Sequence, residues 1–195
     1  MRYVALLRGI NVGGNKLLKM AEVRERLEGK IFKRVTTHSQ SGNVLFESDT
    51  SDASSLAMAM EKALASAFGH DVPVFLRSQA QMKKIVSQAP AAWKAGRALR
   101  QNVAFLRAPL TAKRVLVEID PKPGVDSVDW GEGVVYMSTV LSRLTQSRFP
   151  KIVGTAIYAD MLTTVHPFAS AASHPTLNFC SLSSRSYANS RVASS

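Results

Sequence analysis

Two short segments concentrate the glycine, amide and cationic side chains that could bind an anion. The first covers residues 6–16 and the second residues 40–44. Short apolar stretches adjoin both segments, so their polar residues should lie on turns that expose backbone N–H groups. Neither segment contains a nucleophile with a base, a metal-ligand set or a complete cofactor motif. We therefore expect a ligand-binding site without catalytic residues, metal or cofactor, formed by Arg8, Asn11, Gly13, Gly14, Lys16, Gln40, Ser41, Gly42 and Asn43.

The first segment departs from the known phosphate-binding loops. It lacks the G-x-G-x-x-G spacing of a dinucleotide turn, and Asn15 stands where a P-loop has its lysine. Leu17 replaces the magnesium-binding hydroxyl residue, so we reject nucleotide hydrolysis. Two interpretations stay open. The glycines allow a tight connection from a strand to a helix, or their N–H groups receive an anion beside Arg8 or Lys16 at a helix start.

The second segment has the same two interpretations. Glycine and asparagine accept positive φ cheaply, so a hairpin alone accounts for Ser41-Gly42-Asn43. Alternatively, Gln40 and Asn43 offer side-chain amides to a ligand. Arg8 follows one strand and Asn43 begins another, and antiparallel pairing at the centre of a sheet would bring these ends together. This pairing predicts one shared site.

The apolar pattern predicts the elements that position these segments. Strands are expected at residues 3–7, 35–40, 44–46 and 72–76, with helices around 20–27 and from Ser51 or Asp52 to Gly69. This β-α-β-β-α-β order is the split βαβ, or ferredoxin-like, plait. We expect the apolar face of both helices to be buried, namely Met20, Val23, Leu27, Leu56, Met60, Leu64 and Phe68.

The order then repeats along the chain. A strand at 103–106, a helix at 111–119, a hairpin at 125–130 and 134–137, and a helix at 141–153 are expected. The fold class is thus α+β, with two tandem ferredoxin-like (α/β plait) subdomains at residues 1–77 and 78–161. The second is expected to be incomplete, because its last element should follow Gly154. Residues 162–195 contain no Asp or Glu and much serine, which indicates a poorly ordered tail.

Composition limits the classes of protein. The chain has 195 residues, 46% of them hydrophobic, and no apolar run reaches the roughly 18 residues of a spanning helix. No signal-peptide core precedes the first strand, and Cys180 is the single cysteine, so we expect a cytoplasmic protein without membrane association. The net charge of +11 permits attraction to phosphates or nucleic acid. The cations are dispersed along the chain, which favours a solvated basic surface.

Other chemistry-bearing residues have structural explanations. Tyr3 and Phe46 lie on the two central strands, where RNA-binding plaits stack bases, but no aromatic cluster surrounds them and core packing is favoured. The four histidines have no metal-ligand spacing. Ser147, Arg148 and Lys151 face either phosphate or solvent on the last expected helix. Trp93 and Trp130 are expected to be packing residues.

The chain resembles the uncharacterised, mostly bacterial family catalogued as domain of unknown function 1697. The matching residues are 6–14, Met20, 40–44, Ser147-Arg148 and 151–155, and the resemblance covers about residues 1–161. Family members continue into an Arg-Asn-Trp-Asn-Thr motif and a closing helix, whereas this chain continues with Leu162-Thr163-Thr164. A reading-frame shift or a lineage-specific tail would each produce that divergence. The resemblance implies the plait architecture and no activity.

Three functions remain. The first is a non-catalytic module that binds a phosphate-bearing ligand or nucleic acid through the Gly/Asn-rich site. The second is a small metal-independent enzyme that acts on an anionic metabolite at Arg8, Asn11, Gln40 and Asn43. The third is an interaction or vestigial protein without a small-molecule site. We favour the first, because it uses both the basic balance and the glycine-rich turns.

Overall fold

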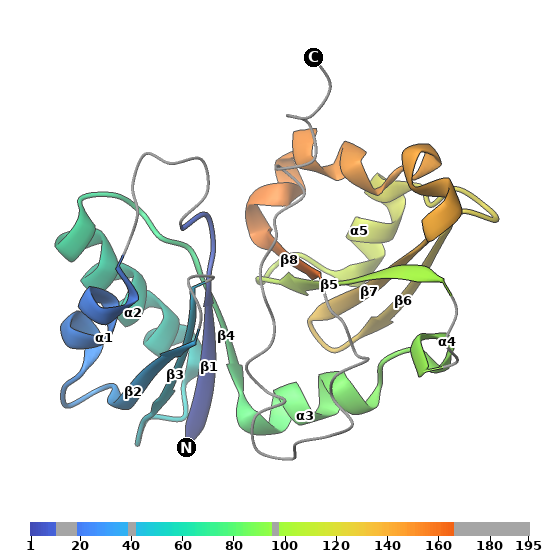
Figure 1. The fold of residues 1–195 in the computed structure, drawn as a ribbon. Helices are drawn as coiled ribbons and strands as arrows, with labels where there is room; N and C mark the ends of the chain where they lie inside the picture. Colours follow the sequence, from blue (N-terminus) through green and yellow to red (C-terminus); the bar gives the residue numbers. More distant parts are fainter. Residues whose placement is uncertain (11–18, 39–41, 95–97, 166–195) are drawn as a thin grey trace. The chain divides into compact units, whose positions relative to one another are not determined.

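The computed structural model describes residues 1–10, 19–38, 42–94 and 98–165 (Figure 1). Of the expected site, Asn11, Gly13, Gly14, Lys16, Gln40 and Ser41 lie outside the described residues. The chain divides into two compact units, Met1–Lys84 and Ile85–Ser195. The boundary falls inside helix α3 (Gln79–Ser87).

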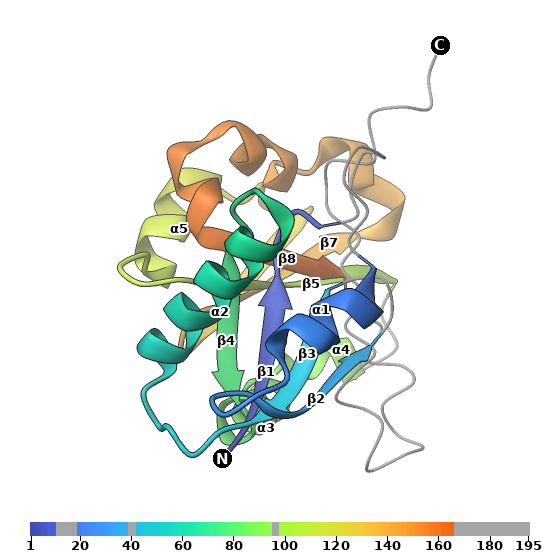
Figure 2. The same cartoon turned by 90° about the vertical axis from the view of Figure 1, so that its left-hand side faces the viewer.

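The first unit is a ferredoxin-like plait. Its elements are β1 (Arg2–Leu7), α1 (Met20–Leu27), β2 (Lys33–His38), β3 (Asn43–Glu47), α2 (Ala53–Phe68) and β4 (Val74–Ser78). The antiparallel strands lie in the order β2-β3-β1-β4. Both helices cover one face of the sheet (Figure 2). This arrangement confirms the split βαβ prediction for the first half of the chain.

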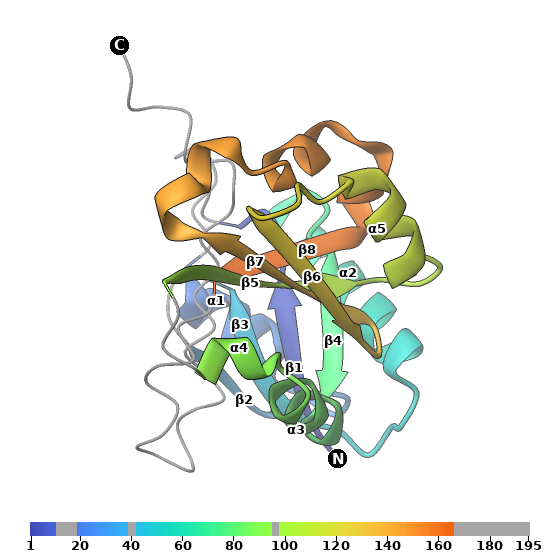
Figure 3. The same ribbon diagram turned by 90° about the vertical axis from the view of Figure 1, so that its right-hand side faces the viewer.

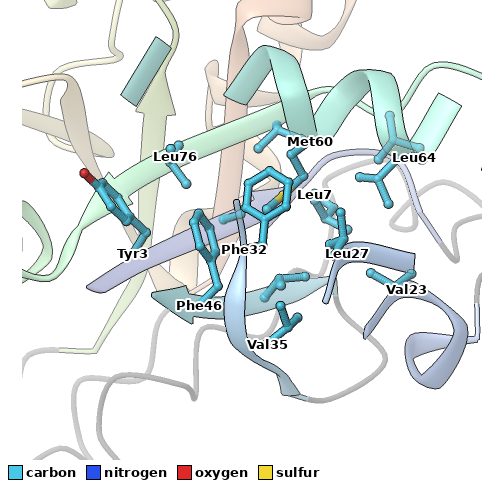
Figure 4. Packing of buried hydrophobic residues seen from close by; sticks show 14 of the residues in the cluster. Tyr3, Leu7, Val23, Leu27, Phe32, Val35, Phe46, Met60, Leu64 and Leu76 are labelled. Carbon is cyan, nitrogen blue, oxygen red and sulfur yellow. The ribbon is translucent and has the colours of Figure 1, made fainter. Parts of the chain in front are cut away.

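The core of this unit lies between the sheet and the two helices. Alternate residues of β1, Tyr3, Ala5 and Leu7, belong to this core together with the apolar faces of α1 and α2 (Figure 4). The helix residues predicted to be buried are buried, except that Phe68 in the last turn of α2 is only partly buried.

Helix α2 has the termini that its sequence predicts. The Asp52 carboxylate accepts a hydrogen bond from Ser54 N at 2.9 Å, and Gly69 ends the helix in the left-handed region. These caps fix the helix ends and therefore the register in which Leu56, Met60 and Leu64 meet the sheet.

The second unit has the same topology. Its elements are α4 (Ala91–Lys94), β5 (Leu99–Leu106), α5 (Ala112–Ile119), β6 (Asp126–Gly131), β7 (Val134–Val140), three 3-10 helices η1 (Leu141–Gln146), η2 (Phe149–Gly154) and η3 (Ala156–Asp160), and β8 (Met161–Val165). The antiparallel strand order is β6-β7-β5-β8 (Figure 3). Two tandem plaits, each with a four-stranded sheet and helices, are therefore confirmed.

Strand β8 corrects the expected start of the tail. Leu162 to Thr164, which we assigned to the tail, are buried and pair with β5. The second sheet therefore has all four strands of a plait. Met161, Leu162, Thr163 and Thr164 are all buried, and their types do not alternate between apolar and polar, so no period-2 pattern marks this strand in the sequence.

The expected helix at 141–153 is also wrong. Pro150 lacks an N–H and clashes with a preceding helical turn, so one α-helix cannot cross it. Ser147 adopts an extended backbone with φ −61° and ψ 142°, which separates η1 from η2. Phe149 and Ile152 nevertheless reach the core of the second unit.

The opposite face of the second sheet packs against the end of α3 and against α4. Trp93 donates from Nε1 to Ser138 Oγ at 2.6 Å, and its ring meets Tyr136 edge-on with centroids 5.7 Å apart. Tyr136 donates its hydroxyl to Ile85 O at 2.6 Å. Trp93 is thus a packing residue as expected, whereas Trp130 is 64% exposed on edge strand β6 and is not.

Candidate functional site

The C-terminal end of β1 and the N-terminal end of β3 adjoin in the first sheet. Leu6 pairs with Asn43, and Leu7 N donates to Gly42 O at 2.9 Å. Arg8 and Gly9 therefore leave the sheet beside the Gly42 turn. Antiparallel pairing predicted this meeting of the two strand ends, and the described parts of both segments show it.

A third backbone segment meets this corner. Arg8 N donates to Pro73 O at 2.9 Å, and the other side of the same peptide unit, Val74 N, donates to Glu61 Oε1 at 2.8 Å. Arg8 is a half-buried residue. The corner thus brings the Arg8 backbone close to a carboxylate supplied by α2, and this negative charge would oppose an anion bound beside it.

The two glycines at the corner have different surroundings. Gly42 has φ +81°, and a Cβ built on it would lie 2.5 Å from Ile10 Cδ1 and 3.2 Å from Leu7 Cβ. Gly9 has φ +74°, but a Cβ there would meet no atom of the described residues within 4 Å. Gly42 is therefore required by close packing as well as by backbone conformation, whereas Gly9 is required by conformation alone.

Asn43 differs from an amide that is offered to a ligand. It is 3% exposed and pairs with Leu6 in the ladder, so its side chain lies inside the folded unit. Gln40 and Ser41, which precede it, lie outside the described residues. Asn43 therefore supports the turn.

The helix that follows the first segment begins later than the anion-site interpretation assumed. Helix α1 starts at Met20, with Lys19 as its N-cap and no side-chain cap. Gly13 and Gly14 are therefore not its first residues. The part of the expected site that relies on the helix dipole loses its basis, because that field acts within the first turn.

The aromatic pair of the central strands belongs to the core. The rings of Tyr3 and Phe46 stack with centroids 5.4 Å apart, and Phe32 meets Phe46 edge-on (Figure 4). Both rings lie on the face that the helices cover, and they are 3% and 2% exposed. This confirms packing over base stacking, because a base needs an open ring face.

Acidic groups with displaced titration lie at the other end of β3. The hydrogen bond from Arg2 and the charge of Arg34 hold the pKa of the Glu47 carboxyl below its ordinary value. Hydrogen bonding by Lys33 lowers the pKa of Asp49 in the same way. Arg2, Arg34 and Lys33 are therefore paired with carboxylates on the protein surface. These pairs lie at the Arg2 end of β1, opposite the end that carries Arg8.

In the second unit, Ser147 and Arg148 serve a buried carboxylate that the sequence analysis missed. Asp126 is 8% exposed and accepts hydrogen bonds from Thr139 Oγ1 at 3.0 Å, Ser147 Oγ at 2.7 Å, Arg148 N at 2.9 Å and Lys122 N at 3.2 Å. The Arg148 guanidinium donates to Asp120. These contacts account for both residues structurally. One aspartate at the start of a strand carries no sequence signal, because its donors are up to 22 residues away.

The described residues bring together no group of three or more His, Cys, Asp and Glu side chains able to hold a metal ion. Over the same part of the chain, no helix is both long and apolar enough to cross a bilayer.

The similarities to known proteins concern the family and the fold, and none of them names a ligand. The family model described as "Protein of unknown function (DUF1697)" matches residues 1–136. A solved structure, the conserved bacterial protein SP0830 from Streptococcus pneumoniae, is similar with a TM-score of 0.74 and 23% sequence identity, over 84% of this chain and 92% of that one. No curated protein matches the chain significantly. The structural likeness concerns the fold alone.

Proposed function

Since the chain belongs to the DUF1697 family of proteins of unknown function, we propose from its own residues that the first unit is a non-catalytic module for a phosphate-bearing ligand. Nucleic acid is the broadest ligand class. The meeting of Arg8 with the Gly42 turn at one corner of the sheet is the observation that supports this proposal most directly.

The corner suits an anion for two reasons. Arg8 is half-buried as a residue, and a guanidinium group donates charge-assisted hydrogen bonds to phosphate oxygens. The net charge of +11 raises the local concentration of any polyanion. The proposed contacts are Arg8 directly and Gly9 through its backbone, with Asn11, Gly13, Gly14, Lys16, Gln40 and Ser41 completing the site.

Arg8→Ala tests this proposal when it is compared with Arg26→Ala. Arg26 is an exposed residue of α1, so both variants lose one positive charge and only Arg8 stands at the corner. We expect Arg8→Ala to weaken binding of ATP and of a short oligothymidylate by about tenfold to a hundredfold, the worth of one charged hydrogen bond. Arg26→Ala should change binding only slightly. Fluorescence anisotropy and calorimetry over a series of salt concentrations measure both effects.

Two results would reject the site. If wild-type protein binds neither probe at low salt, the interaction-protein function becomes the better one. If both variants weaken oligothymidylate equally, the attraction is a general surface effect. Thermal unfolding of Arg8→Ala shows whether its loss of binding reflects loss of the fold.

A further inference from the structure

Strand β6 lies at one edge of the second sheet. Val140 N donates to Val125 O, which lies directly opposite it just before β6. Hydrogen-bonded pairs alternate along an antiparallel ladder, so the residues of β6 that exchange hydrogen bonds with β7 are Ser127, Asp129 and Gly131. The N–H and C=O groups of Val128 and Trp130 consequently point away from β7. Among the described residues, none donates to or accepts from these outward groups.

The edge strands of the first sheet are closed at the corresponding positions. The Glu28 carboxylate accepts from Arg34 N at 2.9 Å and from Val35 N at 2.7 Å, and Arg34 sits in an irregularity of β2 with φ +52°. Glu61 accepts from Val74 N at the start of β4. Carboxylates and irregular pairing are ordinary means of preventing strand addition. In the part of the chain that the structure describes, neither device occurs at Val128 and Trp130 of β6.

The side chains along β6 specify the chemistry of a partner. Trp130 is 64% exposed and lies on the same sheet face as the half-buried Val128. Asp129 is exposed on the other face, and Glu132 follows in the turn. An added strand would place alternate side chains against an apolar surface and against a carboxylate. Apolar residues alternating with basic ones fit both faces.

A second copy of this chain fits the edge poorly. The two-fold antiparallel register that uses Val128 and Trp130 of both copies places Asp129 directly opposite Asp129 of the second copy. Like charges in that position are destabilising. Asp126 N already donates to Lys122 O at 2.8 Å, which removes the outward donor that a shifted register would need.

We propose that the β6 edge binds an extended segment of another protein by strand addition, and that basic residues of the segment face Asp129 while apolar residues face Trp130. The backbone groups of Val128 and Trp130 supply affinity, and the alternation supplies specificity. This surface is independent of the Arg8 corner.

End-blocked peptides of alternating residues test the proposal on the full-length protein. A labelled peptide (Lys-Val)3 is compared with (Glu-Val)3 at physiological ionic strength, where the Debye length of about 8 Å screens repulsion by distant cations. We expect the lysine peptide to bind about tenfold tighter than the glutamate peptide, despite the net charge of +11. Binding should also slow hydrogen exchange at the Val128 and Trp130 amides.

Two variants separate strand addition from general attraction. Val128→Pro removes one outward donor without touching the bonds to β7, so the lysine peptide should bind about tenfold more weakly. Asp129→Lys should reverse the preference to the glutamate peptide. Asp71→Lys, which changes the charge equally at an exposed position of the first unit, should leave the preference intact.

Failure is equally visible. The proposal is wrong if wild-type protein binds neither peptide, if it binds both equally, or if Asp71→Lys and Asp129→Lys behave alike. It is also wrong if the two amides exchange at unchanged rates while peptide is bound. The exchange measurement uses wild-type protein, so it decides the matter even where Val128→Pro does not fold.

Discussion

At Gly42 the backbone conformation and the close packing of Ile10 act together, and Gly9 supplies the matched comparison. An alanine at Gly9 would contact none of the described residues, so it should cost only the left-handed backbone penalty of about 1–2 kcal/mol. An alanine at Gly42 adds a clash with the buried Ile10, which should cost a further ~1–3 kcal/mol. Urea unfolding of the two variants measures the difference. Equal losses would show that Ile10 moves aside freely.

Because Tyr136 is buried, the free energy of unfolding of the second unit should fall at alkaline pH. Burial raises the pKa of its hydroxyl from 10.0 to about 12. Because the folded-state pKa is the higher one, the associated stability is fully present below pH 10 and is lost as the pH rises toward about 12. Tyr136→Phe should lack this alkaline loss. At neutral pH it should be less stable by ~1 kcal/mol, since Ile85 O loses its donor. Unfolding curves recorded across this pH range test both effects, and an unchanged alkaline slope in the variant would contradict the first.

At the scale of elements, no single regular helix spans the described segment between β7 and β8, and hydrogen bonds to the Asp126 carboxylate hold this segment in place. Its carboxylate holds the start of η2 through Arg148 N and joins β7 through Thr139. Asp126→Ala leaves these donors without their acceptor and should cost about 3 kcal/mol. Asp126→Asn should cost less, because its oxygen can face the two amides while its NH2 group donates to the hydroxyls, which can rotate.

Asp129→Ala, at an exposed position on the same strand, is the control for Asp126 and should change stability by less than about 0.5 kcal/mol. Chemical denaturation of the three variants measures the series. A loss in Asp126→Ala no larger than that of the control would mean that packing alone holds η2.

At the scale of the whole molecule, strand β8, the last element among the described residues, decides where the chain can be shortened. A protein ending at residue 167 keeps β8. Its free energy of unfolding should change by no more than the ~0.5 kcal/mol of a surface change, so its melting temperature should change little. A protein ending at Asp160 loses the buried Met161, Leu162 and Thr164 and the ladder with β5. The second unit should then lose its cooperative thermal transition. A large loss already at residue 167 would show that residues 168–195 contribute to the fold.

Local sequence patterns determined much of the fold. The spacing of Met20, Val23 and Leu27, the Asp52 cap and the Gly69 stop depend on neighbouring residues, so the pattern predicted both helices of the first plait. The order of strands and helices predicted the tandem plaits, because few topologies accommodate a hairpin between two helices. The pairing of the β1 and β3 ends followed from that topology.

Tertiary structure alone decided the remaining features, because they depend on partners far along the chain. The Asp126 carboxylate accepts its hydrogen bonds only when Thr139 and Arg148 approach it in the fold. Asn43 is buried because β1 pairs with the strand that it begins. Pro150 interrupts the expected helix, yet only the packing of Phe149 and Ile152 selects short 3-10 turns in its place. Trp130 looks like a core residue in the sequence, but an edge strand has a neighbour on one side only, and this exposes the ring.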